Sequence, residues 1–142
     1  MKQLKLYSKT RKRRASPEAE LQKAVVQYLR LAGVPGLLFF SVPNEQKCSV
    51  QRGAMLKKMG RLAGVSDLVI MAPGEPILFL ELKAKGEKQS DSQRAFECSA
   101  YEYGANYMVA DTITEAVSIL KECGAIKNVP RRRAASPFSE AA

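Results

Sequence analysis

Two strand-length apolar runs, residues 67–72 and 77–83, flank the tetrapeptide Pro73-Gly74-Glu75-Pro76. Neighbouring proline and glycine residues are typical of a tight turn, and apolar runs of this length are typical of strands. The segment therefore predicts a hairpin. Because both runs are strongly apolar, we expect the hairpin to belong to a buried sheet, where an unpaired charge would be costly.

The segments around the hairpin alternate between helix and strand patterns. Helices are predicted at residues 17–32, 51–63, 91–103 and 113–123, and further strands at residues 37–42 and 106–110. Ser16, Ser90 and Thr112 each precede a helix as its N-cap, and Gln93 stands at capping-box spacing from Ser90. Gly60 interrupts the second helix. This order predicts an α/β fold in which helices flank a mixed β-sheet.

The excess positive charge lies at the two ends of the chain. The formal net charge is +9, yet residues 15–130 hold 13 basic and 13 acidic side chains. Residues 1–14 contain seven basic residues and no acidic one, and residues 131–133 are three arginines. We expect one domain at 16–126 between flexible basic tails at 1–15 and 127–142. Such tails favour a polyanionic partner, and a solvated arm without a partner is the alternative.

Composition excludes several kinds of chemistry. The sequence has no histidine, and its three cysteines show no CxxC spacing, which excludes a histidine-based triad and a typical zinc site. No apolar run approaches the roughly 20 residues of a membrane span, so we expect a cytoplasmic protein without membrane attachment. Catalysis would have to use carboxylates, lysines or a metal ion held by oxygen ligands.

The predicted hairpin would bring charged side chains together. If the turn is centred near Gly74, paired residue numbers sum to about 148, and Asp67 then faces Glu81. Strand alternation places Lys83 on the same face as Glu81. Two facing carboxylates repel unless one is protonated or a cation lies between them, and Mg²⁺ prefers such oxygen ligands. The pattern favours a divalent-metal site, and a charge cluster on a solvated sheet face is the alternative.

Several segments in a fixed order carry a family resemblance. They are Glu20 in the first helix, VPNEQK at 42–47, LKKMGRLAGVSDLVI at 56–70, FLELKAKG at 79–86 and SDSQRAF at 90–96. Together they resemble a VRR-NUC domain, the virus-type replication-repair nuclease branch of the PD-(D/E)xK superfamily. The resemblance spans residues 16–120 and implies a restriction-endonuclease-like core. Ser66 stands where the superfamily motif has proline, a position that is not itself a metal ligand.

The resemblance also implies a role for individual residues. Asp67, Glu81 and the backbone carbonyl of Leu82 match the metal ligands, and Glu20 matches the glutamate that supports the metal directly or through water. Lys83 matches the catalytic lysine, and Gln93 matches the glutamine that contacts the nucleophile or the scissile phosphate. Two simpler roles stay open: Gln93 could cap its helix, and Glu20 could be a first-turn acid that favours the helix dipole.

Basic residues around this motif could contact DNA phosphates, although a solvated helix face is an equally good explanation for those on the second helix. The predicted DNA-binding residues are Lys57, Lys58, Arg61, Lys85, Lys88, Arg11, Lys12, Arg13 and Arg14.

The resemblance implies an endonuclease that uses Mg²⁺ or Mn²⁺ and no small-molecule cofactor, and that yields 5′-phosphate and 3′-hydroxyl products. Small members of the group resemble junction-processing homodimers, so the expected substrate is branched DNA such as a four-way junction. A flap or fork nuclease is one alternative. A non-catalytic DNA-binding protein that keeps the nuclease fold is another, and an RNA-binding protein would explain the charge alone.

Overall fold

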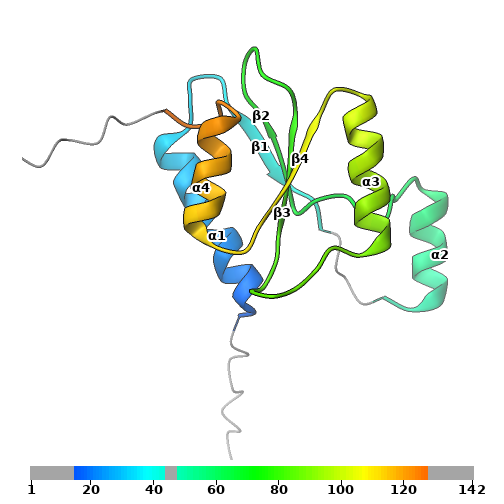
Figure 1. Ribbon diagram of the computed structural model, residues 1–142. Coiled ribbons are helices and arrows are strands. Elements are labelled where there is room, and N and C mark those ends of the chain that lie inside the picture. The colour runs from blue at the N-terminus through cyan, green and yellow to red at the C-terminus, as the bar shows by residue number, and fades with distance from the viewer. Residues whose placement is uncertain (1–14, 44–47, 128–142) are drawn as a thin grey trace, which may run out of the picture.

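The computed structural model describes residues 15–43 and 48–127. Along these residues the helices and strands follow the predicted order (Figure 1). The elements are α1 (Pro17–Ala32), β1 (Leu38–Ser41), α2 (Val50–Lys58), β2 (Leu68–Met71), β3 (Leu78–Leu82), α3 (Asp91–Glu102), β4 (Asn106–Ala110) and α4 (Ile113–Glu122). Among these residues, no helix is both long and apolar enough to cross a membrane.

The four strands form one mixed sheet in the order β1-β2-β3-β4. The pairs β1/β2 and β2/β3 are antiparallel, and β3/β4 is parallel because α3 carries the chain across between them. Figure 1 shows α1 and α4 on one face of the sheet, and α3 with α2 on the other. The predicted α/β architecture is therefore confirmed.

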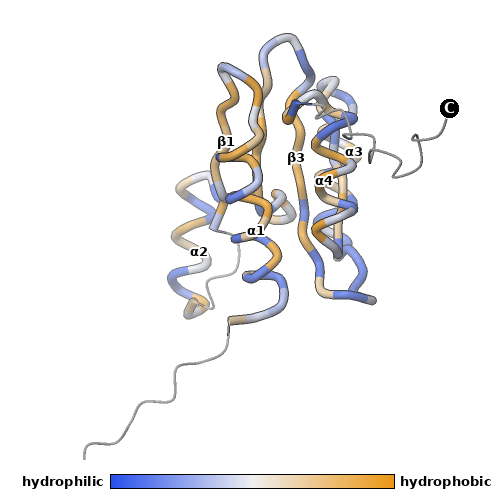
Figure 2. The backbone as a smooth tube through the Cα atoms, turned by 90° about the vertical axis from the view of Figure 1, so that its left-hand side faces the viewer, coloured by the Kyte–Doolittle hydropathy of each residue, from blue (hydrophilic) through white to orange (hydrophobic). Residues whose placement is uncertain are grey.

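The main apolar core lies between the sheet and the pair α1 and α4. Alternate strand residues point into it, and Leu68, Leu80 and Leu82 are almost fully buried there together with Val25 and Leu29 of α1. In Figure 2 the hydrophobic colour runs along β3 and gives way to hydrophilic colour near its C-terminal end. Because strand side chains alternate, the neighbouring odd-numbered residues of β3 face α3 instead.

Several predicted boundaries differ from the structure. The second helix ends at Lys58 rather than continuing to residue 63, because Gly60 adopts a left-handed φ of 96° that stops the helix. Residues 60–67 form the connection to β2 instead. The hairpin strands are each shorter than predicted, so that Asp67 comes directly before β2 and Lys83 directly after β3.

Candidate active site

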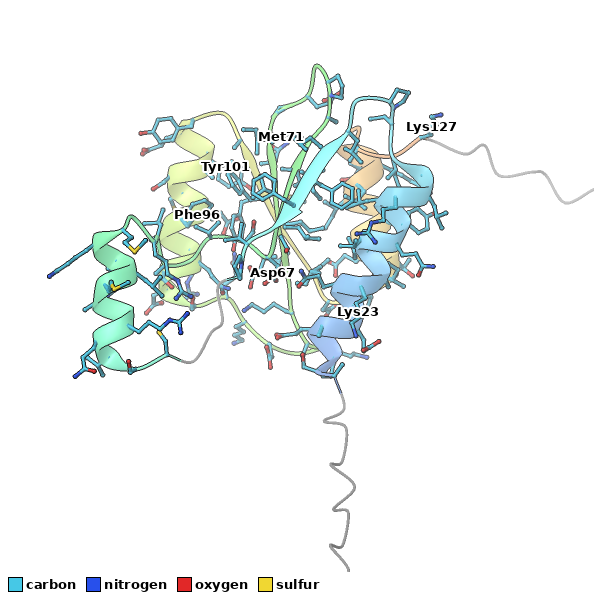
Figure 3. All side chains as sticks on the ribbon, turned by 180° about the vertical axis from the view of Figure 1, so that it is seen from behind. Lys23, Asp67, Met71, Phe96, Tyr101 and Lys127 are labelled. Atoms are coloured by element: carbon cyan, nitrogen blue, oxygen red, sulfur yellow. The ribbon has the colours of Figure 1, made fainter. Side chains whose placement is uncertain are left out.

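The hairpin register brings the two predicted carboxylates to one end of the sheet. Leu68 pairs with Leu80 and Ile70 with Leu78, so paired numbers sum to 148, as the turn position predicts. Extending this register by one position places Asp67, directly before β2, opposite Glu81. Its Oδ2 accepts a hydrogen bond of 2.8 Å from the backbone N–H of Leu82. The bond fixes the Asp67 carboxylate against the C-terminal end of β3, and Figure 3 shows Asp67 between α1 and the α2–α3 side of the molecule.

Glu81 lies at the centre of a polar cluster that also contains Asp67, Lys83 and Gln93. The residue is only 4% exposed, and its Oε1 lies 3.1 Å from Nζ of Lys83. The same oxygen accepts a short hydrogen bond from Nε2 of Gln93. Burial first, and then the negative charge of Asp67, raise the pKa of Glu81 to about 7, against the opposing effect of Lys83 and Gln93. This site therefore strongly disfavours two simultaneous negative charges unless another cation is present.

Gln93 caps α3 and also contacts the buried carboxylate, while its predicted contact with the nucleophile or the scissile phosphate stays a prediction. Its backbone N–H donates to Oγ of Ser90 at 3.3 Å, and its Oε1 accepts from the backbone N–H of Ser90 at 2.8 Å, which completes the capping box of α3. The remaining side-chain atom, Nε2, donates to Glu81. Because the cap fixes the side chain, the amide is held in one orientation toward the buried carboxylate.

The connection that carries Asp67 packs tightly against the start of α3. Gly64 has a φ of 86°, and a Cβ placed there would overlap the carbonyl group of Ser92. Ser66 is fully buried, and its Oγ donates to the backbone oxygen of Leu68 at 2.8 Å. This hydrogen bond lies at the position where the motif that the sequence resembles has proline.

The first helix presents Glu18 to the cluster, two residues before the glutamate predicted from the sequence. Glu18 lines one pocket with Asp67, and its Oε1 accepts from the backbone N–H of Ala84 at 3.3 Å. Glu20 is exposed and pairs with Lys23 at 3.0 Å. Residues two apart on a helix point in directions about 200° apart, so the two glutamates cannot share this pocket. The role predicted for Glu20 at the metal site stays a prediction, and its observed contacts do not lead there.

The predicted phosphate-binding residues are spread over several surfaces. Lys57 and Arg61 line one groove of about 340 Å³, whose other wall includes Ser90 and Gln93. Lys58 is exposed on α2 and does not line this groove. Lys85 and Lys88 are exposed in the connection from β3 to α3. The predicted residues of the N-terminal tail, Arg11, Lys12, Arg13 and Arg14, lie outside the described part of the chain. Residues 44–47 of the VPNEQK segment lie outside it as well.

Sequence reasoning missed Glu18 and Gly64. Glu18 carried a signal, because it is the other acid in the first turn of α1, but the sequence does not fix which acid faces the sheet. Gly64 stands within the quoted GVSDL segment, three residues before a predicted metal ligand, and a glycine there can mark a close backbone approach.

The donor set fits a hard divalent cation. Among the residues that the structure describes, no group of three or more Asp, Glu, His or Cys side chains could hold a metal ion. Two carboxylates with one backbone carbonyl and water would suit Mg²⁺, which retains several waters. The N–H and C=O of a strand residue face the same edge, so the carbonyl of Leu82 lies on the Asp67 side. A cation there would counteract the burial and the repulsion by Asp67 that together raise the pKa of Glu81.

Comparisons with known proteins agree with this architecture. A solved structure described as "VRR_NUC domain protein" has a TM-score of 0.64 and 22% identity, and the match covers 78% of this chain and 89% of that chain. A second, described as "VRR_NUC domain", has a TM-score of 0.52 and 22% identity, and the match covers 75% and 97%. No family model and no curated protein matches the sequence. The chain therefore has the restriction-endonuclease-like fold of VRR-NUC domains, as its motifs predict.

Proposed function

We propose that the protein is a nuclease that hydrolyses DNA phosphodiesters with Mg²⁺ or Mn²⁺. The observation that carries the proposal is the arrangement of Asp67, Lys83 and Gln93 around the buried carboxylate of Glu81 at the end of β3. A solvated charge cluster would not require the burial of Glu81, whose ionisation costs free energy in this environment. The fold shared with two VRR-NUC structures supports the same chemistry.

In the proposed reaction, water attacks phosphorus in line and the 3′ oxygen leaves, so that the products carry a 5′-phosphate and a 3′-hydroxyl. A divalent ion held by Asp67, Glu81 and the carbonyl of Leu82 would supply a more acidic water and neutralise the phosphoryl oxygens. Lys83 would orient the attacking water and offset charge that develops on the phosphate, and its 3.1 Å contact with Glu81 supports this role. Gln93 holds Glu81 in position and also lines the groove that contains Lys57 and Arg61.

We further propose branched DNA as the substrate and a homodimer as the active form, with four-way junctions cut by two symmetric sites. Lys57 and Arg61 support a phosphate-directed contact, which reads DNA shape rather than sequence. Flap and fork substrates are the alternative within the same activity.

The test is a cleavage assay on end-labelled four-way junction, flap, fork and linear duplex, each with Mg²⁺, Mn²⁺ or EDTA. Asp67→Asn and Glu81→Gln should each lower the cleavage rate by about 10²-fold to 10³-fold while the protein stays folded. Asp91→Asn is the matched control, because Asp91 is an exposed carboxylate that pairs with Arg94 outside the cluster. Binding of these DNAs without cleavage in either metal would instead identify a non-catalytic DNA-binding protein.

A further inference from the structure

A second groove, almost entirely apolar, runs beside α3 on the face of the sheet that carries the candidate active site. Its volume is about 490 Å³. The groove contains Phe79 of β3 and Phe96 of α3, whose rings meet edge to face at a centroid distance of 5.0 Å. Leu62, Ile77 and Tyr103 also line it and are exposed, with Tyr103 88% accessible. Apolar and aromatic side chains thus line a solvent-accessible recess instead of being buried in the core.

The helix side of the groove is open because its residues are small. Positions 92, 95, 99 and 100 of α3 recur at helical spacing and hold only serine or alanine. Phe96 and Tyr103 stand among them on the same side of the helix. The groove is therefore a recess lined by aromatic rings and by the hydroxyl-bearing residues Ser92 and Ser99, and we call it the aromatic recess.

This apolar groove is continuous with the basic groove that contains Lys57 and Arg61. Three residues, Leu62, Ala63 and Ser92, line both. Gln93, in the wall of the basic groove, donates to Glu81 in the candidate active site. The cluster around Glu81, the basic groove and the aromatic recess therefore follow one another along α3.

We propose that the aromatic recess binds an unpaired nucleobase of a DNA strand whose phosphates lie in the basic groove. This inference rests on the proposed function for the identity of the strand. Phosphates complement Lys57 and Arg61, and a base is the apolar, planar group that a strand carries beside its phosphates. Base stacking on aromatic side chains is tolerant of sequence, and paired bases inside a duplex are not accessible to such a recess. The recess would thus favour substrates with unpaired nucleotides next to the cut.

The experiment measures binding in EDTA, where no cleavage is expected. The probes are a short thymidine oligonucleotide, an oligonucleotide of the same length with abasic sites throughout, and a blunt duplex. Ala95→Leu fills the recess at an exposed helix position, and Cys98→Leu is the matched control because Cys98 is exposed on α3 but does not line the recess. Ser99→Leu repeats the test one turn further along.

We expect Ala95→Leu and Ser99→Leu to weaken thymidine binding by about fivefold to tenfold, which corresponds to the loss of one stacked base. Binding of the abasic strand and the duplex should not change, and Cys98→Leu should bind every probe as the wild type does. The slope of affinity against salt should also stay constant, because the phosphate contacts are retained.

Equal thymidine affinity in the wild type and both filled variants would overturn the proposal. An equal loss on all three probes, together with a change in molar mass by light scattering, would also overturn it and identify a second copy of the chain as the occupant. The proposed function fails separately, in the cleavage assay: a protein that binds unpaired bases through this recess but never cuts DNA would keep this inference and lose the nuclease.

Discussion

The two faces of the sheet differ in what they bury. The face toward α1 and α4 is covered by apolar side chains from both helices, and its residues from β2 and β3 have almost no solvent exposure. The face toward α3 carries the buried carboxylate of Glu81, its two hydrogen-bonding partners and an open aromatic groove. Because side chains alternate along a strand, Leu80 and Glu81 are neighbours in sequence and belong to different faces.

This contrast separates stability from chemistry. The α1/α4 face buries apolar side chains and stabilises the fold. This stabilisation can offset the cost of the buried carboxylate on the α3 face. The α3 face holds a carboxylate whose pKa is raised to about 7 and a recess that leaves apolar surface in water, and neither feature favours folding. Substitutions matched across the sheet can test this division.

The largest loss of stability should come from a substitution on the closed face, the one packed against α1 and α4. Leu80→Ala removes a fully buried side chain from the core and should lower the free energy of unfolding by about 3 kcal/mol, because it leaves a cavity. Ile77→Ala, at a residue 40% exposed beside the open groove, should cost less than about 1 kcal/mol. Urea denaturation of both variants measures the difference. Equal losses would show that the α3 face contributes as much to stability as the closed one.

Gly64 should be the most sensitive backbone position on the α3 face. Gly64→Ala adds a methyl group that overlaps the Ser92 carbonyl, in a left-handed conformation, and should cost about 3 kcal/mol in unfolding free energy. Gly74→Ala is the matched control, because Gly74 has a similar φ of 78° and nothing within 4 Å of an added Cβ. It should cost only about 1 kcal/mol.

The same pair also tests how Asp67 is positioned. If Gly64→Ala remains folded at low temperature, its cleavage rate should fall as well, because the connection to Asp67 is displaced from α3. Thermal melting and the cleavage assay together decide this. A Gly64→Ala protein with the melting temperature and activity of Gly74→Ala would contradict the close packing.

The sequence predicts the site where local rules determine geometry. The position of the Pro-Gly turn fixes the register that places Asp67 opposite Glu81, and the capping-box spacing correctly identifies the cap made by Gln93. The contact between Gln93 and Glu81 is not local, and the resemblance singled out Gln93 for a different contact, with the nucleophile or the scissile phosphate.

The remaining features depend on how separate elements pack. The sequence does not fix the rotation of α1 about its axis, and this rotation selects Glu18 over Glu20 for the pocket beside Asp67. The aromatic recess likewise combines residues from the connection after α2, from β3 and from α3, none of which signals a groove alone. Helix patterns identify an amphipathic face, but they do not determine which side chains another element leaves uncovered.

The buried carboxylate predicts a pH dependence that the apolar face cannot produce. The pKa of Glu81 is about 7 in the folded protein, above the unfolded value near 4.5, so the folded state binds this proton more tightly. Its contribution to stability is then fully present below pH 4.5 and is lost as pH rises toward and through 7. Between pH 5 and pH 8 in EDTA, wild type should lose about 2 kcal/mol relative to Glu81→Gln.

Urea titrations at the two pH values measure this difference, and the Glu81→Gln protein cancels the other titrating groups. A divalent ion should reverse the trend, since it requires the ionised carboxylate, so its affinity should rise with pH up to about 7. An identical pH profile in both proteins would show that Glu81 ionises as an exposed glutamate does.

The smallest expected effect distinguishes the two glutamates of α1. Glu18→Gln keeps an oxygen that can accept from the backbone of Ala84 but removes a negative charge from the pocket beside Asp67, so Mg²⁺ affinity should fall by about tenfold. Glu20→Gln loses only an exposed pair with Lys23, and its Mg²⁺ affinity should stay within about twofold of wild type. Calorimetric titration with Mg²⁺ compares the two. A larger loss in Glu20→Gln would mean that α1 turns when the ion binds and that Glu20 supports the metal, as the family motif implies.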